Sequence, residues 1–216
     1  AMIFEKYLEA LHGEGLFKET TLADLEEALA QAEKQGLIKE EAITKCYALQ
    51  PVFPFFLWQQ VMIKGEGVGR EGATSLEKAF CQYMSILAQS YDALMESKES
   101  GKRQVGQFLF RQDRENLQKA LNRVLAAQGD FYRLHAVFNT YYFDAPLYIE
   151  AIAWMEEVAG KLEGYGEPKR DAKFLGKYAH VIGNLGTQYL HTKDYLLARQ
   201  KFQKTLELYE KAGQRQ

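Results

Sequence analysis

The sequence predicts a mainly α-helical protein that ends in an α-α superhelix of stacked helical hairpins. Large apolar residues recur every three or four positions after Gly72, and this spacing gathers them on one face of a helix. The C-terminal segment also repeats an earlier one, because a shift of 47 residues carries Tyr148 and Ala151 onto Tyr195 and Ala198. Self-similarity at a fixed offset is typical of stacked arrays.

The N-terminal part predicts a helix followed by two short strands. Thr21 and Asp24, three residues apart, match a capping box that starts a helix. The segments 36–38 and 46–49 fit two strands around a charged turn. The alternative is one helix over 40–49, because its apolar residues also lie at helical spacing. We favour the strands.

A glycine-rich linker is expected over 65–72. Thr74, with Glu77 three residues later, matches a second capping box, so we expect a helix that starts there and ends near Lys98. The polar stretch 97–102 then interrupts the apolar pattern.

A further helix is predicted from Asp113 to the turn at Gly129, and it completes a helical connector over 73–130. The hairpins follow over 131–216. A long loop is expected between the two copies at 163–173, which is rich in Gly, Lys and Glu.

The later copy resembles the tetratricopeptide repeat (TPR). The matching positions are Leu185, Gly186, Tyr189, Tyr195, Ala198 and Phe202. Thr205 and Glu210 stand where the family prefers Ala and often has Pro. Asn139 replaces the glycine in the earlier copy, so we expect the helices of that hairpin to lie slightly farther apart. The resemblance implies protein binding rather than chemistry.

The order of segments resembles STAND-type signalling ATPases, the bacterial relatives of NB-ARC and NLR proteins. In that family a nucleotide-binding module precedes a winged helix, a helical connector and a repeat array. The resemblance rests on residues 36–38 followed by 47–51, and on residues 114–117 followed by Ala120 and Leu121. It implies a winged-helix-like subdomain over 1–64.

The sequence contains no GxxxxGK[ST] phosphate-binding loop. If the resemblance to the STAND family holds, the nucleotide-binding module is therefore expected upstream of this chain. We also expect the repeat array to continue beyond it, because a solenoid normally ends in a polar cap.

In the tetratricopeptide family, the first helix of each hairpin lines a groove that binds partners. Carried over to this sequence, the resemblance implies seven partner-binding residues: Arg133, Thr140, Asp144, His180, Asn184, Thr187 and His191. For the two histidines, the alternative is an ordinary half-exposed position on a helix. The Lys and Asn combination with which chaperone-docking members bind a carboxylate is absent, so capture of a peptide C-terminus is not expected.

Charge and hydropathy disfavour a nucleic-acid-binding, membrane or secreted protein. The chain has 216 residues and a formal net charge of −2, with both signs interspersed, which is not typical of proteins that bind nucleic acids or membrane surfaces. Its apolar runs are shorter than the roughly 20 residues that cross a bilayer, and its N-terminus lacks a signal-peptide pattern. We therefore expect a cytoplasmic protein with no membrane partner.

Residues that could support chemistry lack the required spacing. Cys46 and Cys81 are far apart and have no CxxC companion, which fits reduced, buried thiols. The four histidines are not spaced as metal ligands. The glycines at 65, 67 and 69 are interpreted as a hinge, since no strand precedes them. We expect no catalytic residue, no metal and no cofactor.

These observations predict a non-catalytic sensor segment of a larger signalling protein, which binds a peptide or protein in its groove and contacts an upstream nucleotide-binding module. One alternative is a structural scaffold that self-associates through Leu206, Leu208 and Tyr209. Another is a winged-helix transcriptional regulator. The helix over 22–35 carries four acidic residues against one lysine, which disfavours contact with DNA phosphates.

Overall fold

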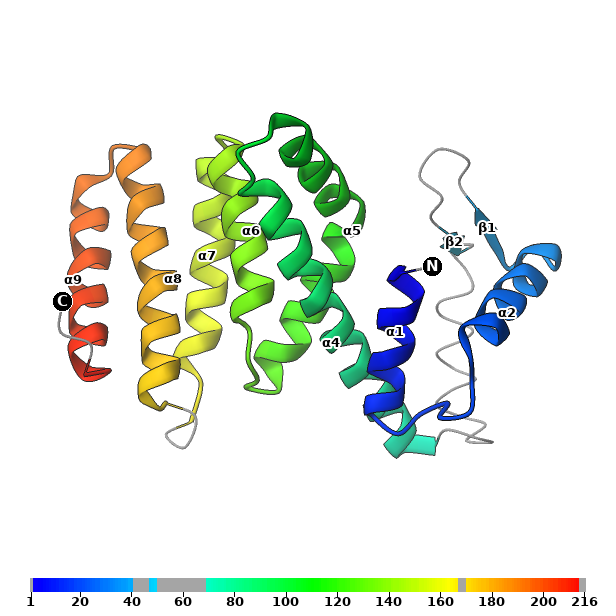
Figure 1. Cartoon of the computed structure of the whole chain (residues 1–216). Coiled ribbons are helices and arrows are strands. Elements are labelled where there is room, and N and C mark those ends of the chain that lie inside the picture. The colour runs from blue at the N-terminus through cyan, green and yellow to red at the C-terminus, as the bar shows by residue number, and fades with distance from the viewer. Residues whose placement is uncertain (1, 41–46, 50–68, 167–169, 214–216) are drawn as a thin grey trace. The chain divides into compact units, whose positions relative to one another are not determined.

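The computed structural model describes residues 2–40, 47–49, 69–166 and 170–213. They form eight helices and two short strands (Figure 1). The chain divides into two compact units, Ala1–Tyr83 and Met84–Gln216, with the boundary inside one long helix.

The first unit contains α1 (Met2–Gly13), α2 (Leu22–Lys34), β1 (Ile38–Glu40), β2 (Tyr47–Leu49) and the first half of α4 (Gly69–Met95). The predicted capping box at α2 is confirmed: Thr21 Oγ1 accepts a 3.3 Å hydrogen bond from the Asp24 N–H, and the Asp24 carboxylate accepts one of 2.7 Å from the Thr21 N–H. After α2, Gly36 turns the chain at a φ of +71°, a conformation that glycine adopts without strain.

Two strands pair in this region. Ile38 lies opposite Leu49 and Glu40 opposite Tyr47 in an antiparallel ladder, which confirms the strand interpretation and rejects the helix for the described part of 40–49. The first strand is Ile38–Glu40 rather than the predicted 36–38, so residues 39 and 40 belong to the strand and not to the charged turn. Residues 41–46 lie outside the described residues.

Helix α1 is an element that the sequence prediction missed. Ala10 and Leu11 of α1 form a small buried core with Ala79 of α4, and the rings of Tyr7 and Tyr83 pack beside it with centroids 5.0 Å apart. Leu8 and Leu11 of α1 lie at helical spacing, but this spacing does not identify the partner of α1, which lies almost 70 positions later in the chain.

Helix α4 corrects the predicted linker and the predicted helix start. It begins at Gly69, so residues 69–72 are helical and Thr74 lies inside the helix instead of capping it. Gly69 and Gly72 each cost only about 1 kcal/mol relative to alanine in a helix, so they disfavour a helix here without preventing it. The helix ends at Met95 rather than near Lys98. Residues 65–68 lie outside the described residues.

Helix α5 (Ser100–Ala126) begins well before the predicted start at Asp113. Its first half is polar and therefore shows little apolar periodicity, but it packs closely on the end of α4. A Cβ atom on Gly106 would lie 2.8 Å from the Met95 side chain, and Phe110 is completely buried. Asp113 itself accepts a 2.7 Å hydrogen bond from the Tyr91 hydroxyl group of α4.

The second unit continues with two helical hairpins. The first consists of α6 (Tyr132–Asp144) and α7 (Tyr148–Glu163), and the second of α8 (Ala172–His191) and α9 (Tyr195–Lys211). The turns of the two hairpins lie 47 residues apart, as predicted, since α6 and α8 end at positions 144 and 191 and α7 and α9 begin at 148 and 195. The predicted connection over 163–173 is shorter than expected, because α7 includes Glu163 and α8 begins at Ala172. Residues 167–169 lie outside the described residues.

Helices α5 to α9 pack in chain order, each against the next (Figure 1). The buried residues of α6 recur in α8 at the same offset: Leu134, His135 and Phe138 correspond to Val181, Ile182 and Leu185. Tyr142 and Tyr189 occupy equivalent places, each two residues before its helix ends. A Cβ atom on Gly186 would lie 2.9 Å from the Phe202 ring.

As expected from Asn139, which replaces the glycine of the later copy, α6 and α7 lie farther apart than α8 and α9. Helices α8 and α9 approach each other closely along their length, whereas α6 and α7 do so at few positions. The close approach depends on Gly186, which leaves room for an aromatic ring between two helix axes.

Candidate functional site

The four predicted site residues of α8 share one face of that helix. His180, Asn184, Thr187 and His191 follow one another at spacings of three or four, so their side chains leave the helix in one direction. Lys177, which the sequence analysis did not name, precedes His180 at the same spacing. Its Nζ lies 2.6 Å from the carboxylate of Asp130, just before α6, and 5.8 Å from the ring centroid of Tyr132 in α6.

His180 also contacts α6. Its ring meets that of Tyr132 edge to face, with centroids 5.6 Å apart. The Asn184 amide lies 3.2 Å from His180 Nδ1. Burial lowers the pKa of His180, which favours the neutral ring at pH 7, and a proton on Nε2 then lets Nδ1 accept the hydrogen bond from Asn184.

Thr140 of α6 connects to α4 within the second unit. Its hydroxyl group donates a 2.6 Å hydrogen bond to Asp92. Burial raises the pKa of Asp92, and the hydrogen bond from Thr140 partly offsets that effect. We call the surface formed by Asp92, Tyr132, Thr140, His180 and Asn184 the α6–α8 face.

The other predicted residues lie near the α6–α8 face but outside these contacts. Arg133 is exposed, and exposed Asp144 accepts a 3.3 Å hydrogen bond from Gln107 of α5. His191 is exposed and stacks on Tyr148 of α7, with centroids 4.8 Å apart. The Thr187 hydroxyl group donates to the carbonyl of Gly183 in its own helix.

Sequence reasoning missed Asp92, Tyr132 and Lys177. The signal that could have found them is the repeat offset, because residues one repeat apart face each other across neighbouring first helices. Asp92 and Thr140 are 48 positions apart, and Asp130 and Lys177 are 47.

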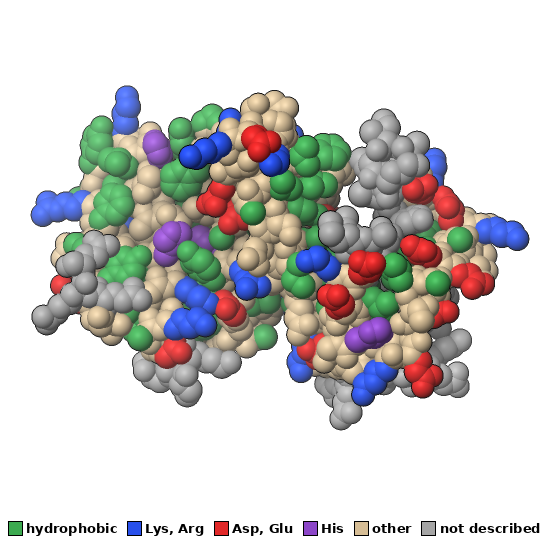
Figure 2. All heavy atoms as spheres, viewed as in Figure 1, with side chains coloured by type: hydrophobic (Ala, Val, Ile, Leu, Met, Phe, Trp, Pro, Cys, Tyr) green, Lys and Arg blue, Asp and Glu red, His purple; other side chains and the backbone are tan. Residues whose placement is uncertain are grey.

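The surface of the second unit has mixed chemistry. In the view of Figure 2, hydrophobic and histidine side chains lie among acidic and basic ones. Within the described ranges, no group of three His, Cys, Asp or Glu side chains is arranged to hold a metal ion. Cys81 is half-buried rather than buried as predicted, and Cys46 is outside the described residues.

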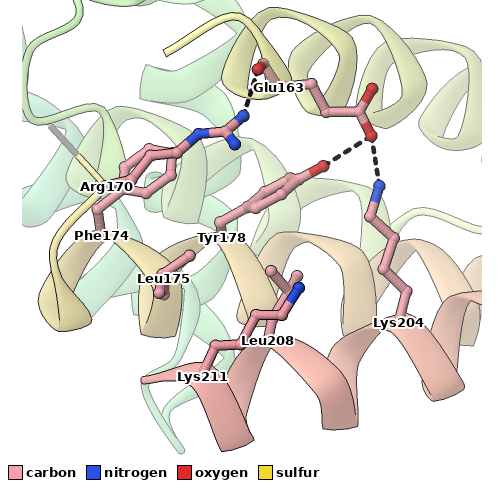
Figure 3. A pocket seen from close by; sticks show the side chains of 8 residues that line it. All are labelled: Glu163, Arg170, Phe174, Leu175, Tyr178, Lys204, Leu208 and Lys211. Atoms are coloured by element: carbon pink, nitrogen blue, oxygen red, sulfur yellow. Dashed lines mark hydrogen bonds and ion pairs between the residues drawn. The ribbon is translucent and has the colours of Figure 1, made fainter. Parts of the chain in front are cut away.

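A pocket of about 500 Å³ lies on the opposite side of α8, between the end of α7 and α9 (Figure 3). Tyr178 lines it, and His180 of the α6–α8 face follows two positions later. Two positions correspond to a rotation of about 200° around a helix, so the pocket and the α6–α8 face are separate surfaces.

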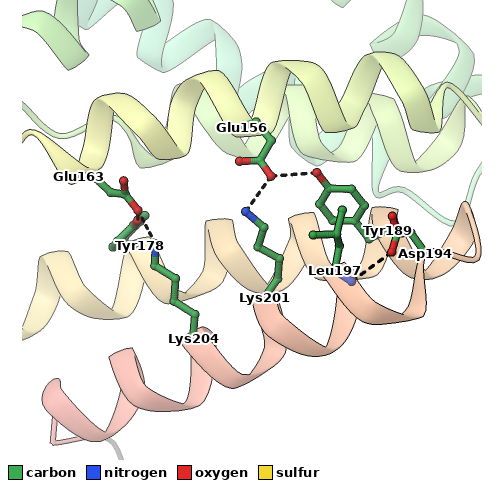
Figure 4. A network of polar contacts seen from close by, with 8 residues as sticks. All are labelled: Glu156, Glu163, Tyr178, Tyr189, Asp194, Leu197, Lys201 and Lys204. Atoms are coloured by element: carbon green, nitrogen blue, oxygen red, sulfur yellow. Dashed lines mark hydrogen bonds and ion pairs between the residues drawn. The ribbon is translucent and has the colours of Figure 1, made fainter.

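Beside the pocket, two acidic residues of α7 join three helices (Figure 4). Glu156 accepts a 2.9 Å hydrogen bond from the Tyr189 hydroxyl group and lies 2.7 Å from Lys201 Nζ. Glu163 accepts a 3.0 Å hydrogen bond from Tyr178 and pairs with Lys204. Each carboxylate therefore bonds to a tyrosine of α8 and a lysine of α9.

Comparisons with protein-family models, curated proteins and solved structures each give no match to this chain. None of the helices in the described ranges has both the length and the apolar character that a membrane crossing requires.

Proposed function

We propose that this chain is a non-catalytic protein-interaction segment that binds a peptide or protein segment on the α6–α8 face. The observation that carries the proposal is the meeting of residues from successive first helices, Thr140 with Asp92 and His180 with Tyr132. Stacked hairpins hold such side chains on a rigid frame, and a rigid frame reduces the entropy lost on binding.

The chemistry of the α6–α8 face suits a polypeptide partner. Tyr132 offers a half-buried aromatic ring, and aromatic side chains are enriched at binding hot spots. Asn184 and His180 offer amide and imidazole groups that can bond to a peptide backbone. Because both signs of charge are present nearby, in Arg133 and Asp144, the partner need not carry a strong net charge.

The resemblance to STAND-type ATPases supports a place for this segment in a cytoplasmic signalling protein. There, a partner bound to the α6–α8 face would favour one arrangement of the domains only if its affinity for the two arrangements differs. The proposal includes an intramolecular contact between this segment and an upstream nucleotide-binding module.

The proposal can be tested with peptides selected from a displayed random library against the whole chain. The affinity of one selected peptide, measured by fluorescence anisotropy, is expected to fall about tenfold in Arg133→Glu and Asn184→Ala, which corresponds to about 1.4 kcal/mol. Arg199→Glu and Gln203→Ala, on the exposed surface of α9, are the matched controls. Equal affinity for all four variants would overturn the proposal.

A second candidate function is a scaffold that self-associates through α9. Exposed apolar side chains favour it: Tyr195, Leu196 and Leu206 are 64%, 68% and 59% exposed. Of the residues predicted for this surface, Leu208 is buried at 8% exposure, because it faces the pocket beside α8. Light scattering of Leu196→Lys and Leu206→Lys tests this candidate, since both substitutions are expected to lower the mass of any oligomer.

A further inference from the structure

The pocket between α7, α8 and α9 is lined by both apolar and cationic side chains. Phe174, Leu175 and Leu208 are apolar, and Arg170, Lys204 and Lys211 are cationic (Figure 3). Its volume of about 500 Å³ falls within the range of about 300 to 1,000 Å³ that small-molecule sites occupy.

The cationic side chains of the pocket are only partly neutralised by the described residues. Lys204 pairs with Glu163, the one carboxylate among the described lining residues. Arg170 donates from Nη2 to the backbone carbonyl of Glu163, but its Nε is buried and has no hydrogen-bond partner among the described residues. Lys211 is exposed and likewise has no partner there. A buried N–H group without a partner is costly, so a bound acceptor would offset that cost.

The apolar side chains of the pocket are packed against neighbouring residues. The Phe174 ring stacks on Tyr165, with centroids 5.0 Å apart and planes at 22°, and on Tyr178, with centroids 6.0 Å apart. Phe174 and Leu208 are each only 8% exposed. A flat apolar group can therefore contact Phe174 and Leu208 without first ordering them.

We propose that this pocket binds a small amphipathic organic anion. The carboxylate or phosphate head group accepts hydrogen bonds from Arg170 and pairs with Lys211, while the flat apolar body lies against Phe174 and Leu208. The site is distinct from the α6–α8 face, so this inference does not depend on the function proposed above. Because the pocket exists only when α7, α8 and α9 are packed together, the ligand also stabilises the fold.

Isothermal titration calorimetry on the whole chain tests the proposal with three probes of similar shape: 2-naphthoate, 2-naphthyl phosphate and the neutral 2-naphthamide. One or both anions are expected to bind with a stoichiometry of one and at least tenfold more tightly than the amide. The two anions distinguish a carboxylate from a phosphate head group. Equal binding of the amide, or no saturable binding of either anion at millimolar concentration, would overturn the proposal.

Variants locate the site. Lys211→Gln, at an exposed position that does not support the fold, is expected to weaken the anion at least fivefold, and Arg170→Gln at least tenfold. Arg199→Gln lies on α9 outside the pocket lining and is the matched control, with unchanged affinity. Glu163→Gln removes the competing carboxylate and is expected to tighten binding. If Lys211→Gln and Arg199→Gln weaken the anion equally, the site lies elsewhere and the proposal fails.

Discussion

The hydroxyl group of Tyr189 in α8 donates a 2.9 Å hydrogen bond to Glu156 in α7, and the same carboxylate lies 2.7 Å from Lys201 of α9 (Figure 4). Seven residues farther along α7, Glu163 makes the corresponding contacts with Tyr178 and Lys204. Two helical turns separate the two carboxylates, so both lie on one face of α7. The last hairpin, α8 and α9, is thus bonded to α7 at two positions, Glu156 and Glu163.

Removal of the Tyr189 hydroxyl group is expected to destabilise the second unit. Tyr189→Phe leaves the ring in place but removes the hydrogen bond to Glu156, at a cost of about 1 kcal/mol. Tyr195→Phe, at an exposed position on α9, is the control and is expected to change stability by less than about 0.5 kcal/mol. Urea unfolding followed by circular dichroism measures both. A midpoint for Tyr189→Phe equal to that of the control would show that the contact contributes nothing.

His135 is expected to make the stability depend on pH. Burial, with a smaller contribution from His180, lowers its pKa to about 3, against about 6.5 in an unfolded chain. Between these values the unfolded chain binds a proton that the folded chain does not, so the free energy of unfolding falls by about 1.4 kcal/mol per pH unit as the pH decreases.

The variant His135→Phe keeps an aromatic ring in the stack with Trp154 and removes the titrating group. We expect its stability to change less than that of the original chain between pH 7 and pH 5, in thermal unfolding followed by circular dichroism. His191→Gln, at an exposed position, is the control and keeps the original pH dependence. Parallel loss of stability in the original chain and in His135→Phe would contradict this assignment.

Two helical glycines are expected to respond in opposite directions to alanine. Gly186→Ala places a Cβ atom 2.9 Å from the Phe202 ring, and overpacking of this kind costs about 1 to 3 kcal/mol. Gly160→Ala has no atom within 4 Å of the new Cβ and is expected to stabilise α7 by about 0.5 to 1 kcal/mol. Adding Phe202→Leu should recover part of the loss at Gly186, because it removes the atoms that clash. A Gly186→Ala variant as stable as Gly160→Ala would contradict the close approach of α8 and α9.

Loss of the Thr140 hydroxyl group is expected to raise the pKa of Asp92 further. Burial already raises it, and the hydrogen bond from Thr140 is the interaction that lowers it. Thr140→Val keeps the shape of the side chain and removes the donor. A titration of the Asp92 carboxyl carbon followed by NMR measures the change, and Thr187→Val, whose hydroxyl group bonds within its own helix, is the control. An unchanged or lower pKa in Thr140→Val would exclude the contact between α4 and α6 in solution.

Local sequence determined several elements because their causes lie within a few residues. The capping box of α2 needs only Thr21 and Asp24. The hairpin turns follow from the 47-residue offset, and the tight pairing of α8 with α9 follows from Gly186. These features depend on neighbours in the chain or on a repeated pattern, both of which can be seen in the sequence.

Other elements were decided by contacts distant in sequence. Helix α1 is held by Ala79 and Tyr83, and the polar first half of α5 by the fit of Gly106 against Met95. The apolar spacing of α1 does not identify its distant partner, and the first half of α5 shows little apolar periodicity. The predicted starts at Thr74 and Asp113 were wrong for the same reason, since a cap or an apolar run indicates where a helix can begin but not how far tertiary contacts extend it.

For the candidate sites too, the sequence indicated some of the residues and only the tertiary structure identified the others. The repeat pattern alone placed Thr140, His180 and Asn184 on first helices, because spacing fixes the face of a helix. Only the tertiary structure decided that Asp92 and Tyr132 complete the α6–α8 face, and that Arg170, Phe174 and Lys211 surround one pocket. The physical reason is that side chains from separate helices meet only after packing has fixed the distance and rotation of each helix against the next.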